Sequence, residues 1–282
     1  MWAGKNTFLI FISVFVVGFS IQEAMNSVFA LGDLAMWTEE LKFFIAQDPR
    51  QFDFRGAYGN PGTPVLELGT VLHTLIGVSH KNAITLSVSI LVSLSVAACS
   101  VVCYALQPAS LWWLATACTL LLNRLSISAT PPTAIAMPLI TLVVLFTWWI
   151  VNETAGLAKK YSLGWGSVVG LACATRIEVA LLVSVPFSLL IVLRHGWRTL
   201  LPMTAGVIAV FFLADPYLWL MPVQHLTDIV RRFTINYAQY PDIPIFIDEL
   251  VYTLWLAALS ACWCLALLMR DRLPRVLPGA II

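Results

Sequence analysis

Charged side chains are scarce in this sequence, and their scarcity excludes most classes of soluble protein. Asp, Glu, Lys and Arg make up 11% of the 282 residues, whereas a soluble globular domain carries about 25%. Hydrophobic residues account for 60% of the chain. We therefore expect an integral membrane protein. The formal net charge of +1 offers no basic surface, so we expect no nucleic-acid partner.

Motifs that would indicate other functions are missing as well. The sequence has no glycine-rich nucleotide-binding motif, which argues against a nucleotide-driven pump and against a Rossmann domain for nucleotide sugars. The six cysteines fall in apolar runs without a Cys-x-x-Cys pair, and the four histidines lack the spacing of metal ligands. No metal site is predicted, and a divalent metal ion as cofactor stays an open question at this stage.

Long apolar runs are what the sequence has in abundance. A hydrocarbon core of about 30 Å needs roughly 20 apolar helical residues. The runs predict an all-α, polytopic transmembrane bundle with about seven or eight spans, at 7–31, 83–106, 111–128, 133–151, 163–174, 177–193, 200–220 and 249–269. The fifth run meets the sixth at Arg176, so the pair is either two tilted spans or one broken span.

We expect residues 1–282 to form a single membrane domain, either complete or truncated at its carboxyl end. The first run is longer than the apolar part of a usual signal peptide, so we interpret it as a retained anchor. Lys and Arg are balanced between the two sides of the bundle and do not decide its orientation. All acidic residues except Glu23, Glu153 and Asp271 fall on the side away from an amino terminus in the cytoplasm. The outer face therefore carries most of the acidic side chains that could take part in catalysis or binding.

Two long polar segments, 32–82 and 215–248, are predicted on the outer face. In the first, two amphipathic helices are expected to lie along the membrane interface, on either side of a Gly- and Pro-rich loop, DFRGAYGNPGTP. The apolar face of the first helix consists of Leu34, Trp37, Leu41, Phe44 and Ile45, and that of the second of Val65, Leu68, Leu72, Leu75 and Ile76. Asp33 precedes the first helix, as an N-cap, a functional carboxylate or both.

The order of these features resembles the C-type-fold membrane glycosyltransferases. It is most similar to the branch of protein O-mannosyltransferases and aminoarabinose transferases that use polyprenyl-phosphate sugars. The motifs are Asp33 after the first run, YGNPG (58–62), LIGVS, ATRIE and DPYLWL, spread over about residues 5–235. The chain departs from the family pattern in having Leu34 after Asp33, Asn60 where relatives often have Lys, and no acid in TPPTA (130–134).

The resemblance implies sugar transfer from a polyprenyl-phosphate carrier to a lipid, glycan or protein acceptor. The reaction would occur on the extracytoplasmic side of a multi-pass protein of the bacterial inner membrane, with Asp33 as general base. A positioned carboxylate that removes the proton of an acceptor hydroxyl accelerates its attack by roughly 10² to 10⁴. The departing phosphate requires cations, and arginine can bind two of its oxygens at once.

Nine further residues are candidates for substrate binding, and most have an ordinary structural alternative. Arg124 could extend along the membrane interface, Arg231 could lie on a solvated face, Asp215 could cap a helix, Glu178 could pair with a cation, and Glu39 could be solvated. The candidates are Glu39, Tyr58, Asn60, Arg124, Arg176, Glu178, Asp215, Tyr217 and Arg231.

Two other functions remain open from the sequence. A transporter or lipid flippase would use the same charges as a passage, but it would need ionisable or broken-helix sites near the middle of the membrane. A non-catalytic fragment of the glycosyltransferase fold would bind less of the substrate and would be inactive alone.

Glu23 lies inside the first apolar run. Its side chain is expected either to be a buried partner of an arginine or to line a water-filled cleft.

Overall fold

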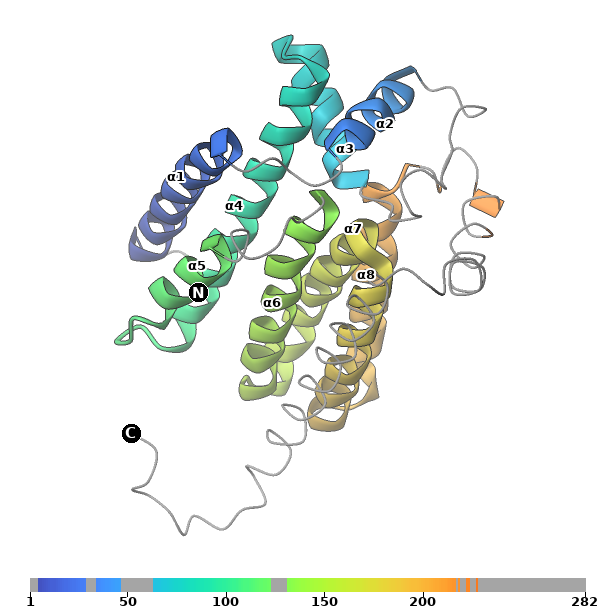
Figure 1. The fold of residues 1–282 in the computed structure, drawn as a ribbon. Coiled ribbons are helices and arrows are strands. Elements are labelled where there is room, and N and C mark those ends of the chain that lie inside the picture. The colour runs from blue at the N-terminus through green and yellow to red at the C-terminus, as the bar shows by residue number, and fades with distance from the viewer. Residues whose placement is uncertain are drawn as a thin grey trace, which may run out of the picture.

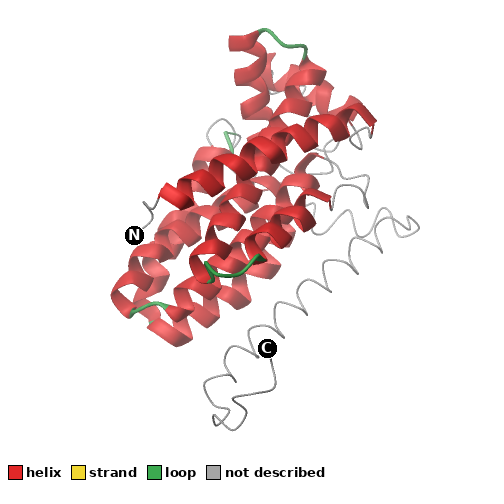
Figure 2. Cartoon of the chain, turned by 90° about the vertical axis from the view of Figure 1, so that its left-hand side faces the viewer, coloured by secondary structure: helices red, strands yellow, loops and turns green. Residues whose placement is uncertain are grey.

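The protein is described by a computed structural model over residues 5–28, 34–46, 63–122 and 131–216, with isolated positions at 218, 222, 223 and 227. Throughout these ranges the regular elements are helices, and strands are absent from them (Figures 1 and 2). The predicted all-α class is confirmed for this part of the chain. The predicted run at 249–269 lies outside the described residues.

Four helical segments are long and apolar enough to cross a membrane. They comprise most of α1 (Lys5–Val28), then α4 (His80–Leu106), α6 (Pro131–Asn152), and α8 (Leu200–Ala214) together with the short 3-10 turn η3 (Trp197–Thr199) before it. The helix α5 (Trp112–Leu122) is apolar but shorter. These helices support a multi-pass membrane protein, and large apolar side chains such as Phe8 and Leu201 are exposed on them, as on a surface that contacts lipid.

Two short helices occupy the first predicted outer segment. Helix α2 (Leu34–Ala46) buries Trp37 and Leu41. Helix α3 (Thr63–Val71) continues into the π-helical turn η1 (Leu72–Ile76), and Gly77 then ends it in a left-handed conformation with φ of 77°. Within the predicted apolar face, Val65 and Leu72 are buried, and Leu75 and Ile76 are exposed. Exposed apolar side chains at these two positions are compatible with a helix at the membrane interface, whose apolar face would contact lipid.

The 41-residue helix α7 (Ala155–His195) reverses direction at Arg176, whose backbone is not helical (φ −154°, ψ 90°). In the first arm, Trp165 Nε1 donates a hydrogen bond to Thr147 Oγ1 of α6 (2.7 Å). In the second arm, His195 Nε2 lies 2.8 Å from the carbonyl oxygen of Ile150, near the end of α6. Both ends of α7 therefore lie beside the same end of α6. The two runs that meet at Arg176 are two antiparallel arms.

The first arm of α7 packs closely against α8, and glycines make the approach possible. A Cβ atom on Gly166 would overlap the carbonyl oxygen of Met203, and one on Gly206 would overlap that of Leu163. A Cβ on Gly170 would lie 2.6 Å from the carbonyl oxygen of Val207. Gly166 and Gly170 form a Gly-x-x-x-Gly pattern, which lets helix backbones touch in membranes where apolar side chains alone provide little driving force.

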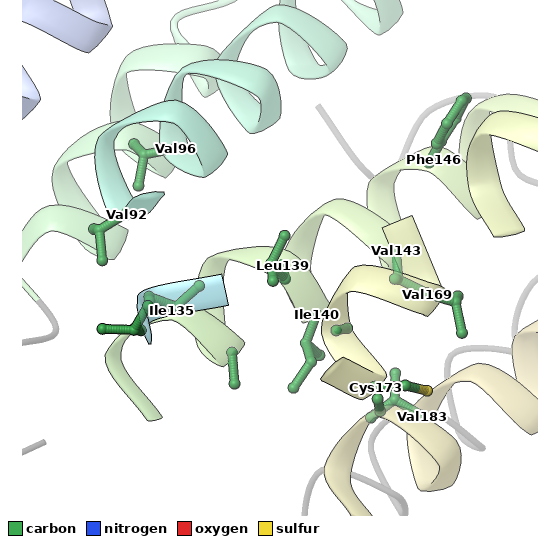
Figure 3. Close-up of a cluster of buried hydrophobic side chains, with 14 of the residues drawn as sticks. Val92, Val96, Ile135, Leu139, Ile140, Val143, Phe146, Val169, Cys173 and Val183 are labelled. Carbon is green, nitrogen blue, oxygen red and sulfur yellow. The ribbon is translucent and has the colours of Figure 1, made fainter. Parts of the chain in front are cut away.

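The core lies where α4, α6 and the two arms of α7 meet. Figure 3 shows Val92 and Val96 on α4, Ile135 and Leu139 on α6, and Val169, Cys173 and Val183 on the arms of α7. Helix α1 joins α4 through polar groups as well, since Asn26 Nδ2 donates to Ser89 Oγ (3.0 Å). The packing holds α6, α7 and α8 side by side (Figure 1).

We expect Gly166→Ala to destabilise the protein by about 1–3 kcal/mol, because the added methyl group would force α7 away from α8. The measurement is thermal unfolding of the detergent-solubilised protein. Gly156→Ala is the matched control, since a Cβ at Gly156 of the same helix meets no atom within 4 Å. Equal melting temperatures for the two variants would contradict the close packing.

Candidate functional site

The hydroxyl group of Thr63, at the start of α3, connects three elements. Its Oγ1 atom lies 2.6 Å from the carbonyl oxygen of Ala214 and 3.2 Å from that of Ala174, and the side chain is completely buried. Ala214 ends α8, and Ala174 lies just before the reversal of α7. Carbonyls at such helix ends have no partner within their own helix. Thr63 therefore fastens α3 to the adjacent ends of α7 and α8.

Arg176 stands at the reversal and is buried, with 7% of its surface exposed. Its Nη1 atom donates a hydrogen bond to Thr133 Oγ1, in the first turn of α6, over 2.7 Å. Burial of a charged group is costly unless it is hydrogen-bonded, so this contact helps to keep the guanidinium inside. The cation also lies at the carboxyl end of the first arm of α7, where the helix dipole favours positive charge.

Two carboxyl groups lie near the same helix ends. Asp215 directly follows α8 and is completely buried. Glu67 lies on α3, one turn after Thr63, and is half-buried. Burial, and secondly the negative charge of Asp215, raise the pKa of Glu67 from 4.5 to about 7. The contact of Thr63 with Ala214, the residue before Asp215, holds this turn of α3 beside the end of α8.

We refer to Thr63, Glu67, Thr133, Arg176 and Asp215 as the rim site. They come from α3, α6, α7 and α8, and they gather at the end of the bundle where α6 begins. The site combines a guanidinium, which can bind phosphate oxygens, with the carboxyl group of Glu67, which can exchange a proton near neutral pH. Such a combination suits a substrate that has both a phosphate and a hydroxyl group.

The structure places the candidates predicted from the sequence in different positions. Arg176 and Asp215 belong to the rim site. Glu39 is exposed and forms an ion pair with Lys42 (2.6 Å) on the surface of α2. Glu178 lies in the second arm of α7, and its side chain is outside the description. The remaining candidates lie outside the described residues, namely Asp33, Tyr58, Asn60, Arg124, Tyr217 and Arg231.

Sequence reasoning missed three members of the rim site. Thr63 and Glu67 are four residues apart, so they share a face of α3, and this spacing is the signal that could have paired them. Thr133 falls in TPPTA, where the resemblance leads one to expect an acid and where a hydroxyl group binds Arg176 instead. Its role depends on the reversal of α7, which no local pattern specifies.

Glu23 is bound by uncharged groups in the structure. Its Oε1 atom accepts hydrogen bonds from Ser89 Oγ (2.6 Å) and from Asn26 Nδ2 (3.0 Å). These contacts join α1 to α4. Among the described residues, Glu23 therefore has these two uncharged partners. An arginine partner was one of the two alternatives considered from the sequence.

Across the described ranges, no group of three or more His, Cys, Asp or Glu side chains is arranged to hold a metal ion. Comparison of the chain with protein-family models, with curated proteins and with solved structures gives no match.

We expect Thr63→Val to destabilise the protein by about 1–3 kcal/mol, because two buried helix-end carbonyls would lose the hydroxyl group between them. Thermal unfolding in detergent measures the effect. Thr63→Ser keeps the hydroxyl group and should retain most of the stability. Thr74→Val is a second control, since the hydroxyl of Thr74 is exposed and bonds within its own helix. A loss as large for Thr74→Val would contradict the role of Thr63.

The stability of the protein should fall as the pH rises through about 7. Folding raises the pKa of Glu67 from 4.5 to about 7, so the folded state holds this proton more tightly than the unfolded chain does. The resulting stabilisation is complete below pH 4.5 and is lost above the folded pKa. Melting temperatures between pH 5.5 and 8.5 test this, with a flatter profile expected for Glu67→Gln. Glu39→Gln, on the exposed surface, should keep the wild-type slope, and identical slopes for all three proteins would contradict the assignment.

Proposed function

We propose that this protein is a membrane glycosyltransferase that moves a sugar from a polyprenyl-phosphate carrier to a hydroxyl group on the extracytoplasmic side of a bacterial inner membrane. The observation that carries the proposal is the buried guanidinium of Arg176, held at the same end of the bundle as the carboxyl groups of Glu67 and Asp215. The order of motifs along the chain gives independent support through its resemblance to the C-type fold.

In this proposal the helices cross the bilayer in alternating directions, with α5 and the two arms of α7 as additional crossings, and the run at 249–269 as an eighth. Helices α2 and α3 lie along the outer interface. The rim site then faces the extracytoplasmic side. The concentration of acidic residues in the outer segments supports this orientation, because the same segments include Glu67 and Asp215.

The lipid tail of the donor lies in the bilayer, and its phosphate binds Arg176. A guanidinium remains charged at every physiological pH and can hold two phosphate oxygens in one plane. The hydrogen bond to Thr133 supports this role because it fixes one edge of the group. Arg124 and Arg231 are further candidates for the phosphate, and Tyr58, Asn60, Glu178 and Tyr217 for the sugar.

The general base is a carboxylate of the first outer segment, and the resemblance gives this role to Asp33, directly before α2. The acceptor O–H bond breaks as its oxygen bonds to the anomeric carbon, and the proton passes to the carboxylate. The bond from that carbon to the phosphate oxygen breaks, and the lipid phosphate leaves with the electron pair. A divalent metal ion could share the neutralisation of this charge.

The position of the helix break favours transfer over transport. In transporters, broken helices and binding residues usually lie near the middle of the membrane. The break at Arg176 lies level with the first turn of α6 and the last turn of α8, because Arg176 bonds to Thr133 and Thr63 joins Ala174 to Ala214. This arrangement supports chemistry at one membrane surface.

Membranes containing the protein should transfer label from at least one member of a panel of radiolabelled polyprenyl-phosphate sugars. Asp33→Asn should lower the rate by about 10² to 10⁴ if it removes the base. Arg176→Gln should raise the KM for the donor. Arg176→Lys should raise it less, because lysine keeps the positive charge but lacks the planar guanidinium group. Arg198→Gln, at an exposed position in η3, serves as the control.

Transfer by wild-type membranes that is unchanged in Arg176→Gln would sink the phosphate assignment. Label that crosses the bilayer without being transferred would favour a flippase. A complete lack of both transfer and transport would leave the fold without this activity and would refute the proposal for this polypeptide.

A further inference from the structure

Glu67 is a titratable carboxyl group of the rim site to which neither the sequence motifs nor the resemblance gives a role. It lies on α3 one turn after Thr63, whose hydroxyl group is 2.6 Å from the carbonyl oxygen of Ala214. Asp215 follows Ala214 immediately. The same hydroxyl group lies 3.2 Å from the carbonyl oxygen of Ala174, two residues before Arg176, so it holds the turn of α3 that carries Glu67 beside both helix ends of the rim site.

Arg176 belongs to the same site through another element. Its guanidinium reaches Thr133 of α6, and α3 packs against α7 and α8. In a direct displacement at the anomeric carbon, the incoming hydroxyl group and the departing phosphate occupy opposite sides of that carbon, so separate groups must serve them. Arg176 on α7 and Glu67 on α3 are a separate cation and carboxyl group at the same end of the bundle.

We propose that Glu67 is the carboxylate that accepts the proton from the acceptor hydroxyl group. This inference rests on the proposed sugar transfer and changes which residue of the first outer segment acts as base. The acceptor O–H bond breaks and its proton passes to a carboxylate oxygen of Glu67. The acceptor oxygen bonds to the anomeric carbon, and the lipid phosphate leaves with the electron pair of the broken carbon–oxygen bond, beside Arg176.

The electrostatic environment of Glu67 fits a proton acceptor at neutral pH. Burial and the negative charge of Asp215 raise the pKa of Glu67 to about 7, so both protonation states are populated and the ionised form is a stronger base than an ordinary carboxylate. Other charged or titratable groups lie on the elements packed around α3, including Glu39, Glu40 and Lys42 on α2, His73 on η1, His80 and Lys81 on α4, and Arg176 on α7. Asp215 is the charge that acts on the pKa of Glu67, which makes it the residue to alter.

The test is the pH dependence of kcat/KM between pH 5 and 9, measured in membranes with the full chain and a polyprenyl-phosphate sugar that the wild type uses. Wild-type activity should rise with pH to a plateau, with a midpoint near 7, because Glu67 must be ionised to accept a proton. Glu67→Gln should lose about 10² to 10⁴ in kcat/KM, and Glu67→Asp should recover part of it. Asp215→Asn should move the midpoint to lower pH, since burial alone would then raise the pKa of Glu67.

Glu153→Gln is the matched control, because Glu153 lies at the opposite end of α6 and accepts a hydrogen bond from Trp149. Melting temperatures show whether each variant folds. The inference would be overturned if Glu67→Gln kept kcat/KM within threefold of wild type and still lost activity at acidic pH, while Asp33→Asn was inactive. The proposed sugar transfer would stand in that case. An unchanged midpoint in Asp215→Asn would overturn it as well. A wild type that transfers none of the sugars would refute the transfer itself, and the role of Glu67 with it.

Discussion

The reversal of α7 at Arg176 is the constraint on which the rest of the structure depends. A straight helix of 41 residues would extend about 60 Å, roughly twice the hydrocarbon thickness of a bilayer. Reversal gives two arms that each match the length of α6, and it leaves the turn at the end where α6 begins. The turn leaves helix-end carbonyl groups without partners in their own helix and buries the guanidinium of Arg176 near them. The hydroxyl group of Thr63 contacts the carbonyl oxygen of Ala174, and that of Thr133 accepts a hydrogen bond from Arg176.

Close packing of α7 against α8 makes the contact at Thr63 possible. A single hydroxyl group can approach two carbonyl oxygens only if their helices end at the same level and nearly touch. The missing side chains of Gly166, Gly170 and Gly206 allow this approach. The glycines lie about one to two turns from Ala174 and Ala214 along the helices, where they allow the two helix ends to lie close together. Packing inside the bundle thereby determines the geometry of the functional groups at its end.

The rim site retains charge where most of the chain avoids it. Burial, and secondly the negative charge of Asp215, disfavour the ionised form of Glu67 and raise its pKa, so the folded state loses some stability as the pH rises toward neutrality. Burial of Arg176 carries a similar cost, which its hydrogen bond to Thr133 reduces. Residues that served stability alone would be apolar at these positions. The proposed sugar transfer would require both groups, because its site must bind a phosphate and move a proton.

Composition and local periodicity were enough to predict a helical protein with long apolar segments and an interruption at Arg176, because these features do not depend on distant contacts. The sequence also marked Arg176 and Asp215 as candidates. Only the folded chain shows that the two runs at Arg176 form antiparallel arms, that Thr133 binds Arg176, and that Thr63 contacts the ends of α7 and α8. These outcomes depend on contacts between residues tens to more than a hundred positions apart, and hydrophobic periodicity carries no information about such contacts.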